Sequence, residues 1–251
     1  MVTRVQIGTS RLENLEAQAL DTFLDKSWIH LGEPCQGSGS DQKGGLAWEM
    51  VVARLYALSL AELNEIIKRR FARRGAERRP HGFSRKALYE KTNFSEFYFE
   101  KGGRLPFDDE TVDFIFSEHF FEHLFLDEAV DLFRECHRVL KPNGLIRTCV
   151  PDADLRTYEP VESVGYPNQC LPYSHPDKHK SRWSVYSLCE ALEHAGFATY
   201  PLRYCDRHGQ YIKSNPEDNQ AFYKDCPEEE LAFSTTYIQR IDSLIVDGIK
   251  L

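Results

Sequence analysis

The chain has no long apolar run and no paired cysteine motif, and these two absences narrow what it can be. A membrane-spanning helix needs about 18 or more consecutive apolar residues, and no run in this 251-residue sequence reaches that length. The start, Met1-Val2-Thr3-Arg4, lacks the apolar core of a signal peptide. We therefore expect a cytoplasmic protein without a membrane partner.

The seven cysteines include no C-x-x-C pair, and their number is odd. A disulfide framework usually has an even number of cysteines, and a zinc ribbon has closely spaced cysteine pairs. Reduced thiols, several of them in the core, are therefore the expected state. Hydrophobic residues make up 41% of the chain, which is ordinary for a globular domain with a sizeable core. We treat residues 1–251 as a single domain.

Residues 105–152 carry the clearest structural pattern. Val112 to Phe116 is a short apolar run rich in β-branched and aromatic residues, which predicts a buried parallel strand. From Asp127 to Leu140 apolar residues recur every three or four positions, which predicts an amphipathic helix. Pro142-Asn143-Gly144 is expected to end that helix, and Leu145 to Val150 to form the next strand. The resulting βαβ unit predicts a doubly wound, mostly parallel sheet.

Ligands of such sheets bind beyond the carboxyl ends of the strands. Here those ends are Ser117 to His123, the richest polar cluster of the chain, and Pro151 to Asp154. His119-x-x-Glu122-His123 also matches a pattern in which two histidines hold zinc and the glutamate acts as a base. No third ligand is evident and the histidines follow a strand, so we predict no metal. An alternative is that Glu122 and His123 only cap and brace the next helix.

Charge is concentrated in one stretch. Between Lys68 and Lys86 there are nine Lys or Arg and one acid, although the whole chain has a formal net charge of -8. The stretch is either a solvated helix face or a clamp for an anionic partner. It closes a segment, residues 46–82, that we predict to be a helical insertion and a possible lid over the ligand cleft. The stretch lacks an interleaved platform of aromatic residues on which bases stack, so it does not favour nucleic acid as the partner.

Two stretches, LPFDDETVDFIFSEHFFEHL and HRVLKPNGLIRTCVPD, resemble the fourth-strand motif and the following helix and fifth strand of class I methyltransferases that depend on S-adenosylmethionine. The resemblance is closest to small methyltransferases of the type 11 kind. Val5 to Gly8 fits the first strand, His179 with Trp183 to Leu188 the late helix, and Ser243 to Lys250 the last strand. The family implies a Rossmann-like, mostly parallel sheet of seven strands with an antiparallel C-terminal strand.

The resemblance also implies the site. His119 would be the catalytic base, because its unperturbed pKa lies near neutrality, with Glu122 and His123 beside it. The cofactor S-adenosylmethionine would contact Gly8, Thr9, Glu33, Leu105, Pro106, Phe107, Ser117 and Glu118. A loop would bind the substrate through His175, His179, Arg182 and Trp183, unless it is a simple surface loop.

The implied function is methyl transfer to an oxygen or nitrogen of a small acceptor, with sugars and anionic compounds as candidates. Nucleotide-binding first turns usually contain several glycines, but the turn from Gly8 to Leu12 contains one. Gly32 stands where the family has an acidic residue, and Glu33 follows it. A relative that has lost the cofactor, and that works as a binding module or runs other chemistry, is therefore the alternative.

Overall fold

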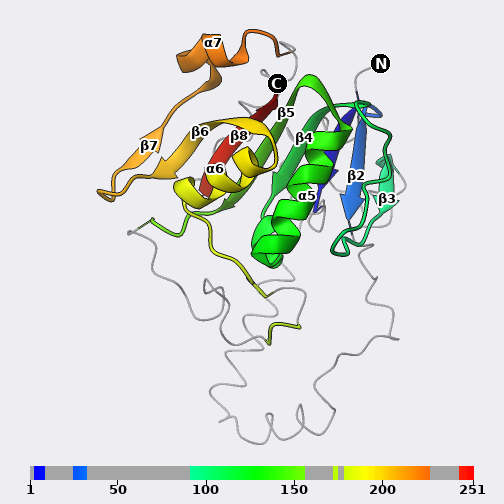
Figure 1. Cartoon of the computed structure of the whole chain (residues 1–251), viewed down its shortest axis with the longest axis horizontal. Helices are drawn as coiled ribbons and strands as arrows, with labels where there is room; N and C mark the ends of the chain where they lie inside the picture. Colours follow the sequence, from blue (N-terminus) through cyan, green and yellow to red (C-terminus); the bar gives the residue numbers. More distant parts are fainter. Residues whose placement is uncertain (1–2, 9–24, 33–90, 156–171, 175–177, 227–242) are drawn as a thin grey trace, which may run out of the picture.

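The computed structural model describes residues 3–8, 25–32, 91–155, 172–174, 178–226 and 243–251, and these residues contain an eight-stranded sheet (Figure 1). The strands are β1 Arg4–Ile7, β2 Trp28–Gly32, β3 Phe94–Glu96, β4 Val112–Glu118, β5 Leu140–Pro151, β6 Phe197–Cys205, β7 Tyr211–Lys213 and β8 Ser243–Lys250. The helices are α5 Leu126–Val139, α6 Val185–His194 and α7 Gln220–Tyr223, with 3₁₀ helices η2 Phe121–His123 and η3 Pro216–Asn219.

The strand order is β3-β2-β1-β4-β5-β8-β6-β7. All pairings from β3 to β5 are parallel, and β8 runs antiparallel to both β5 and β6. The predicted doubly wound, mostly parallel sheet with an antiparallel C-terminal strand is confirmed, with eight strands instead of seven. The chain runs outward from β1 to β3 and then returns to β4 on the other side of β1. Such a reversal of strand order is where ligands bind in open α/β sheets.

Helix α5 forms where the apolar period predicts it. Its backbone begins at a cap in which the Glu128 carboxylate accepts a hydrogen bond from the Phe125 N–H at 2.8 Å. Asp127 and Glu128 in the first turn also suit the positive end of the helix dipole. The buried stripe of α5 packs on the same face of the sheet as α6, and both helices lie in front of the sheet in Figure 1.

The Pro142-Asn143-Gly144 segment does not end the helix, which is a correction to the prediction. Helix α5 stops at Val139, and β5 begins directly at Leu140. The segment is instead a bulge inside β5, because Val112 pairs with Leu140 and Phe114 with Leu145. Asn143 takes a positive φ of 63° there, a conformation that Asn tolerates better than most residues.

The opposite face of the sheet contains a buried ion pair. Side chains alternate between faces along a strand, so Arg147 of β5 and Asp247 of β8, which are register partners, point to the side of Trp28, Phe114 and Tyr223. The Arg147 guanidinium donates to both Asp247 carboxylate oxygens, at 2.7 and 2.6 Å. This pair joins β5 to β8 beneath α7.

Several predictions fall on residues outside the ranges that the structure describes. These are the helical insertion 46–82, the basic stretch 68–86 and most of the first turn after Gly8. Within the described ranges, no helix is long and apolar enough to cross a membrane. The cysteines in those ranges have free thiols: Cys136, Cys149, Cys189, Cys205 and Cys226.

Candidate functional site

Gly8 ends β1 at the point where the strand order reverses. It has a φ of +88°, and its N–H donates to the Leu31 carbonyl at 2.9 Å. A Cβ added to Gly8 would lie 2.6 Å from the Phe120 Cβ and 2.8 Å from its ring. The backbone conformation and the Phe120 side chain thus both require glycine at this position. Phe120, which belongs to the chain's own Ser117 to His123 segment, therefore fills the space beside Gly8.

Ser117 and Glu118 end β4 next to Gly8. Ser117 pairs with Ile7 of β1 on one side and with Thr148 of β5 on the other. Its side chain is fully buried, and its hydroxyl makes no hydrogen bond with any described residue. The structure therefore brings three of the predicted cofactor residues to one place, the carboxyl edge between β1 and β4.

Residues 105–107 lie elsewhere. The Leu105 N–H donates to the Glu135 carboxylate at 2.9 Å, and Arg138 donates to the carbonyls of Leu105 and Phe107 at 3.2 and 3.0 Å. Glu135 and Arg138 belong to the last turns of α5, which lie beside the amino end of β4. The structure therefore does not bring residues 105–107, including the exposed Pro106, together with the other predicted cofactor residues.

His119 follows β4 directly, with a positive φ of 50°. Its N–H donates to the Cys149 carbonyl at 2.8 Å, its Nε2 lies 3.2 Å from the Ser243 hydroxyl, and its Nδ1 lies 3.2 Å from Glu122 Oε1. Burial lowers the pKa of His119, but the Cys149 and Glu122 side chains outweigh burial and raise this pKa to about 10. These contacts favour the protonated imidazole, whereas the predicted base role assumed an unperturbed pKa.

A strap of residues 178–183 is hydrogen-bonded to the 3₁₀ helix η2. The backbone N–H groups of Lys180 and Ser181 donate to the Glu122 carbonyl at 2.7 and 3.2 Å. The Ser181 hydroxyl donates to the Phe121 carbonyl at 3.1 Å. These bonds fix the backbone of the strap against the residues that follow β4, and they place His179 next to the polar cluster.

The docking of the strap on η2 brings three predicted site residues together: Glu122, His123 and His179. The rings of His123 and His179 meet edge to face, with their centroids 4.9 Å apart. One possible ligand atom from each of Glu122, His123 and His179 lies within 4.8 Å of the others. His179 was predicted as a substrate residue, and the structure groups it with the two residues predicted as catalytic. No spacing in the sequence indicates this contact, because it depends on how the strap docks.

The strap continues into the core at Trp183. This side chain is 1% exposed, and its ring meets that of Phe133 edge to face. Asp152, at the end of β5, forms a parallel bridge with Trp183, and the Ala153 N–H donates to the Trp183 carbonyl at 2.8 Å. Trp183 therefore packs inside the protein, while its neighbour Arg182 is exposed. The other predicted site residues, Thr9, Glu33 and His175, lie outside the described ranges.

Asp152 is a positioning residue that sequence reasoning did not single out. Its side chain is almost fully buried and accepts hydrogen bonds from the N–H groups of Cys205, at 2.6 Å, and Asp154, at 2.9 Å. Burial raises the pKa of this carboxyl group, although the two hydrogen bonds act against it. Asp152 ties the end of β5 to β6 and, through its bridge with Trp183, to the strap.

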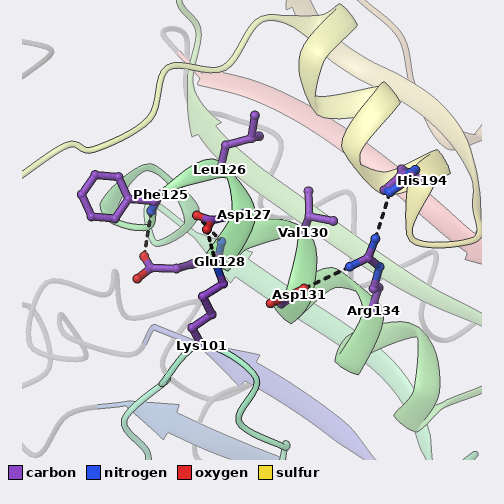
Figure 2. Close-up of a pocket in the computed structure, with 9 residues that line it drawn as sticks. All are labelled: Lys101, Phe125, Leu126, Asp127, Glu128, Val130, Asp131, Arg134 and His194. Carbon is purple, nitrogen blue, oxygen red and sulfur yellow. Dashed lines mark hydrogen bonds and ion pairs between the residues drawn. The ribbon is translucent and has the colours of Figure 1, made fainter.

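A hollow of about 820 Å³ lies along α5, and Figure 2 shows the side chains that line it. Its charged side chains already pair with one another: Lys101 with Asp127, and Arg134 with Asp131 at 3.0 Å. Arg134 also contacts His194 at 2.9 Å. None of the predicted site residues lines this hollow, so the carboxyl edge is the better candidate site.

A family model described as a methyltransferase domain matches residues 49–148. The match includes β3, β4, α5 and the first nine residues of β5, and it starts in a part of the chain that the structure does not describe. Over residues 49–148 the chain is therefore similar to a methyltransferase domain. This match agrees with the predicted methyltransferase family and enzyme class.

The solved structures similar to this chain share little sequence with it. A methyltransferase from Haloferax volcanii, in a complex with the Trm112 methyltransferase activator, is 19% identical, with a TM-score of 0.48 over 99% of this chain and 82% of the other. An S-adenosylmethionine-dependent methyltransferase from Archaeoglobus fulgidus is 16% identical, with a TM-score of 0.47 over 99% and 86% of the two chains. A comparison with curated proteins found no match.

Proposed function

We propose that this domain transfers a methyl group from S-adenosylmethionine to an oxygen or nitrogen of a small acceptor at the carboxyl edge of β1 and β4. One observation carries the proposal: the chain that matches a methyltransferase family reverses its strand order between β1 and β4. Gly8, Ser117 and Glu118 lie at that reversal and would hold the cofactor. The buried Ser117 hydroxyl, with no hydrogen bond to a described residue, is a polar group that suits a ligand there.

The cofactor, when bound, supplies a methyl group on a positively charged sulfur. The acceptor atom forms a bond to the methyl carbon, the electrons of the carbon–sulfur bond stay with sulfur, and the acceptor loses one proton. The protein contributes mainly by holding the two reactants in line. The side chains placed to meet an acceptor are His119, Glu122 and His123, because they directly follow the predicted cofactor edge, and His179 from the strap.

The small acceptor, with sugars and anionic compounds as candidates, remains part of this proposal. It is supported by the basic stretch 68–86, whose positive charge suits an anionic ligand. Residues 46–82 would form the lid that helps select this acceptor.

Phe120 favours a second candidate function. Its side chain packs against Gly8, at the turn where the protein backbone usually contacts a bound nucleotide. A protein in which Phe120 keeps this place would bind an acceptor-like ligand without methyl transfer. Under that function the domain is a binding module that retains the fold of its family.

Ultraviolet cross-linking with S-adenosylmethionine labelled in its methyl group distinguishes the two functions. We expect label on peptides that contain residues 112–123, since these end at the proposed cofactor edge. Peptides from the β6–β7 hairpin, residues 197–213, serve as the internal control and should stay unlabelled. Equal labelling of both regions, or labelling that excess unlabelled S-adenosylhomocysteine does not reduce, would contradict the methyltransferase proposal and favour the binding module.

A further inference from the structure

Glu122, His123 and His179 combine the residue types of a metal centre with an unusual environment for a carboxylate. The Glu122 side chain is fully buried, and neither of its oxygens accepts a hydrogen bond from a described residue. The His119 Nδ1 lies 3.2 Å from one of these oxygens. A buried carboxylate is costly unless it is paired and hydrogen-bonded or binds a metal. With two oxygens, Glu122 can keep its contact with His119 and still bind an ion.

The His123 ring already has the orientation of a metal ligand. Its Nδ1 lies 3.3 Å from the Lys178 carbonyl, and its Nε2 lies 4.0 Å from Glu122 Oε1. In the tautomer whose Nδ1 donates to this carbonyl, the Nε2 lone pair is available on the nitrogen that lies 4.0 Å from Glu122. Histidines that bind metals usually hold their second nitrogen in this way.

The distances allow an ion with a small adjustment of the side chains. The three ligand atoms lie within 4.8 Å of one another. Ligands at about 2.0–2.2 Å from a tetrahedral zinc ion are separated by about 3.3–3.6 Å. Side-chain rotations that move the ligand atoms by about 1 Å close this difference. The backbone can stay in place, because the strap is hydrogen-bonded to the Glu122 carbonyl.

We propose that Glu122, His123 and His179 bind a divalent first-row transition-metal ion, with zinc as the reference ion. Two imidazoles and one carboxylate favour such ions over magnesium and calcium, which prefer oxygen ligands. The sequence alone predicted no metal because it showed no third ligand, and the docked strap supplies one.

Three protein ligands leave a coordination position open, and the side chain of His123 keeps 27% of its surface exposed. An acceptor oxygen can take this position, which is the one part of the inference that rests on the proposed function. Zinc binding itself does not depend on it.

The test uses the full chain, stripped of metal with a chelator, reduced, and titrated with zinc chloride by calorimetry without S-adenosylmethionine. We expect one ion per chain. The Glu122→Gln and His179→Ala variants should each bind at least about 100-fold more weakly, since loss of an outer-shell partner alone costs about 10- to 100-fold. His208→Ala, in the β6–β7 turn, is the matched control for surface histidines and should bind like the unmodified chain.

Two further measurements distinguish this site from zinc bound by cysteines and from a variant that has lost its fold. A cobalt titration reports cysteine ligands through an intense sulfur-to-metal absorption band, which we expect to be absent. Circular dichroism shows whether each variant is folded. Binding that persists in folded Glu122→Gln and His179→Ala, a sulfur band, no zinc binding at all, or tighter binding of magnesium than of zinc would each overturn the proposal. Because no cofactor is present, any of these results leaves the methyltransferase proposal standing.

Discussion

Asp247 and Glu122 are both fully buried carboxylates, but their surroundings differ. Asp247 receives two hydrogen bonds from Arg147 and a third, at 2.7 Å, from the Tyr223 hydroxyl. Glu122 has a histidine within 3.2 Å, and no described residue donates a hydrogen bond to its oxygens. The first carboxylate belongs to a closed network that joins β5, β8 and α7. The second belongs to an open cluster at the carboxyl edge.

The difference shows that burial of a charge does not by itself mark a functional site. A closed network has no capacity left for a ligand, and its role is to connect elements of the fold. The open cluster keeps a carboxylate out of water with only His119 beside it, so most of its hydrogen-bonding capacity is unused, which is unusual in native proteins. The partly paired carboxylate at Glu122 therefore points to a ligand, whereas the fully paired one at Asp247 points to stability.

The largest expected effect on the free energy of unfolding comes from replacing each of the two carboxylates by the amide of the same size. Asp247→Asn leaves the buried Arg147 without its counter-ion and should lower the free energy of unfolding by about 3–5 kcal/mol. Glu122→Gln leaves only the partly exposed His119 without its partner and should lower it by less than about 1.5 kcal/mol in the absence of metal. Urea unfolding of both variants checks this. Equal losses would mean that the two carboxylates have the same structural role.

A smaller effect on the free energy of unfolding tests the packing of Phe120 on Gly8 at the carboxyl edge. Gly8→Ala places a methyl group 2.6 Å from the Phe120 Cβ at a φ of +88°, so we expect a loss of about 2–4 kcal/mol in the free energy of unfolding. The matched control is Gly102→Ala, because Gly102 has a φ of +74° and a Cβ added there would meet no described atom within 4 Å. The control should lose about 1–2 kcal/mol, from its backbone alone. Thermal or urea unfolding that shows the same loss for both variants would refute the packing of Phe120 on Gly8.

The sequence predicts much of the fold because periodicity is a local signal. The apolar run and the helical period give β4 and α5 nearly as observed, and the family resemblance gives β8. The error at Pro142-Asn143-Gly144 has a physical reason. These turn residues can form a bulge within a strand as readily as they end a helix, and pairing of Leu140 with Val112 decides between the two.

The site is less predictable, because it depends on contacts between distant residues. The strand end places Ser117, His119 and Glu122 at the carboxyl edge, as the sequence predicts. The contact of His179 with this group depends on the hydrogen bonds of the strap, and the place of residues 105–107 depends on Arg138. Neither tertiary contact leaves a pattern in one sequence. The packing of Phe120 on Gly8 is likewise visible only in the fold.

Calorimetric titration of the full chain with S-adenosylhomocysteine, in the presence of a chelator, tests the central claim most directly. The account predicts saturable heat that corresponds to one ligand per chain, because the edge between β1 and β4 would hold the cofactor whether or not a metal is bound. The Asp247→Asn variant, provided that it is folded, should bind with the same affinity. An absence of heat at millimolar S-adenosylhomocysteine would contradict the assignment of methyl transfer to this domain.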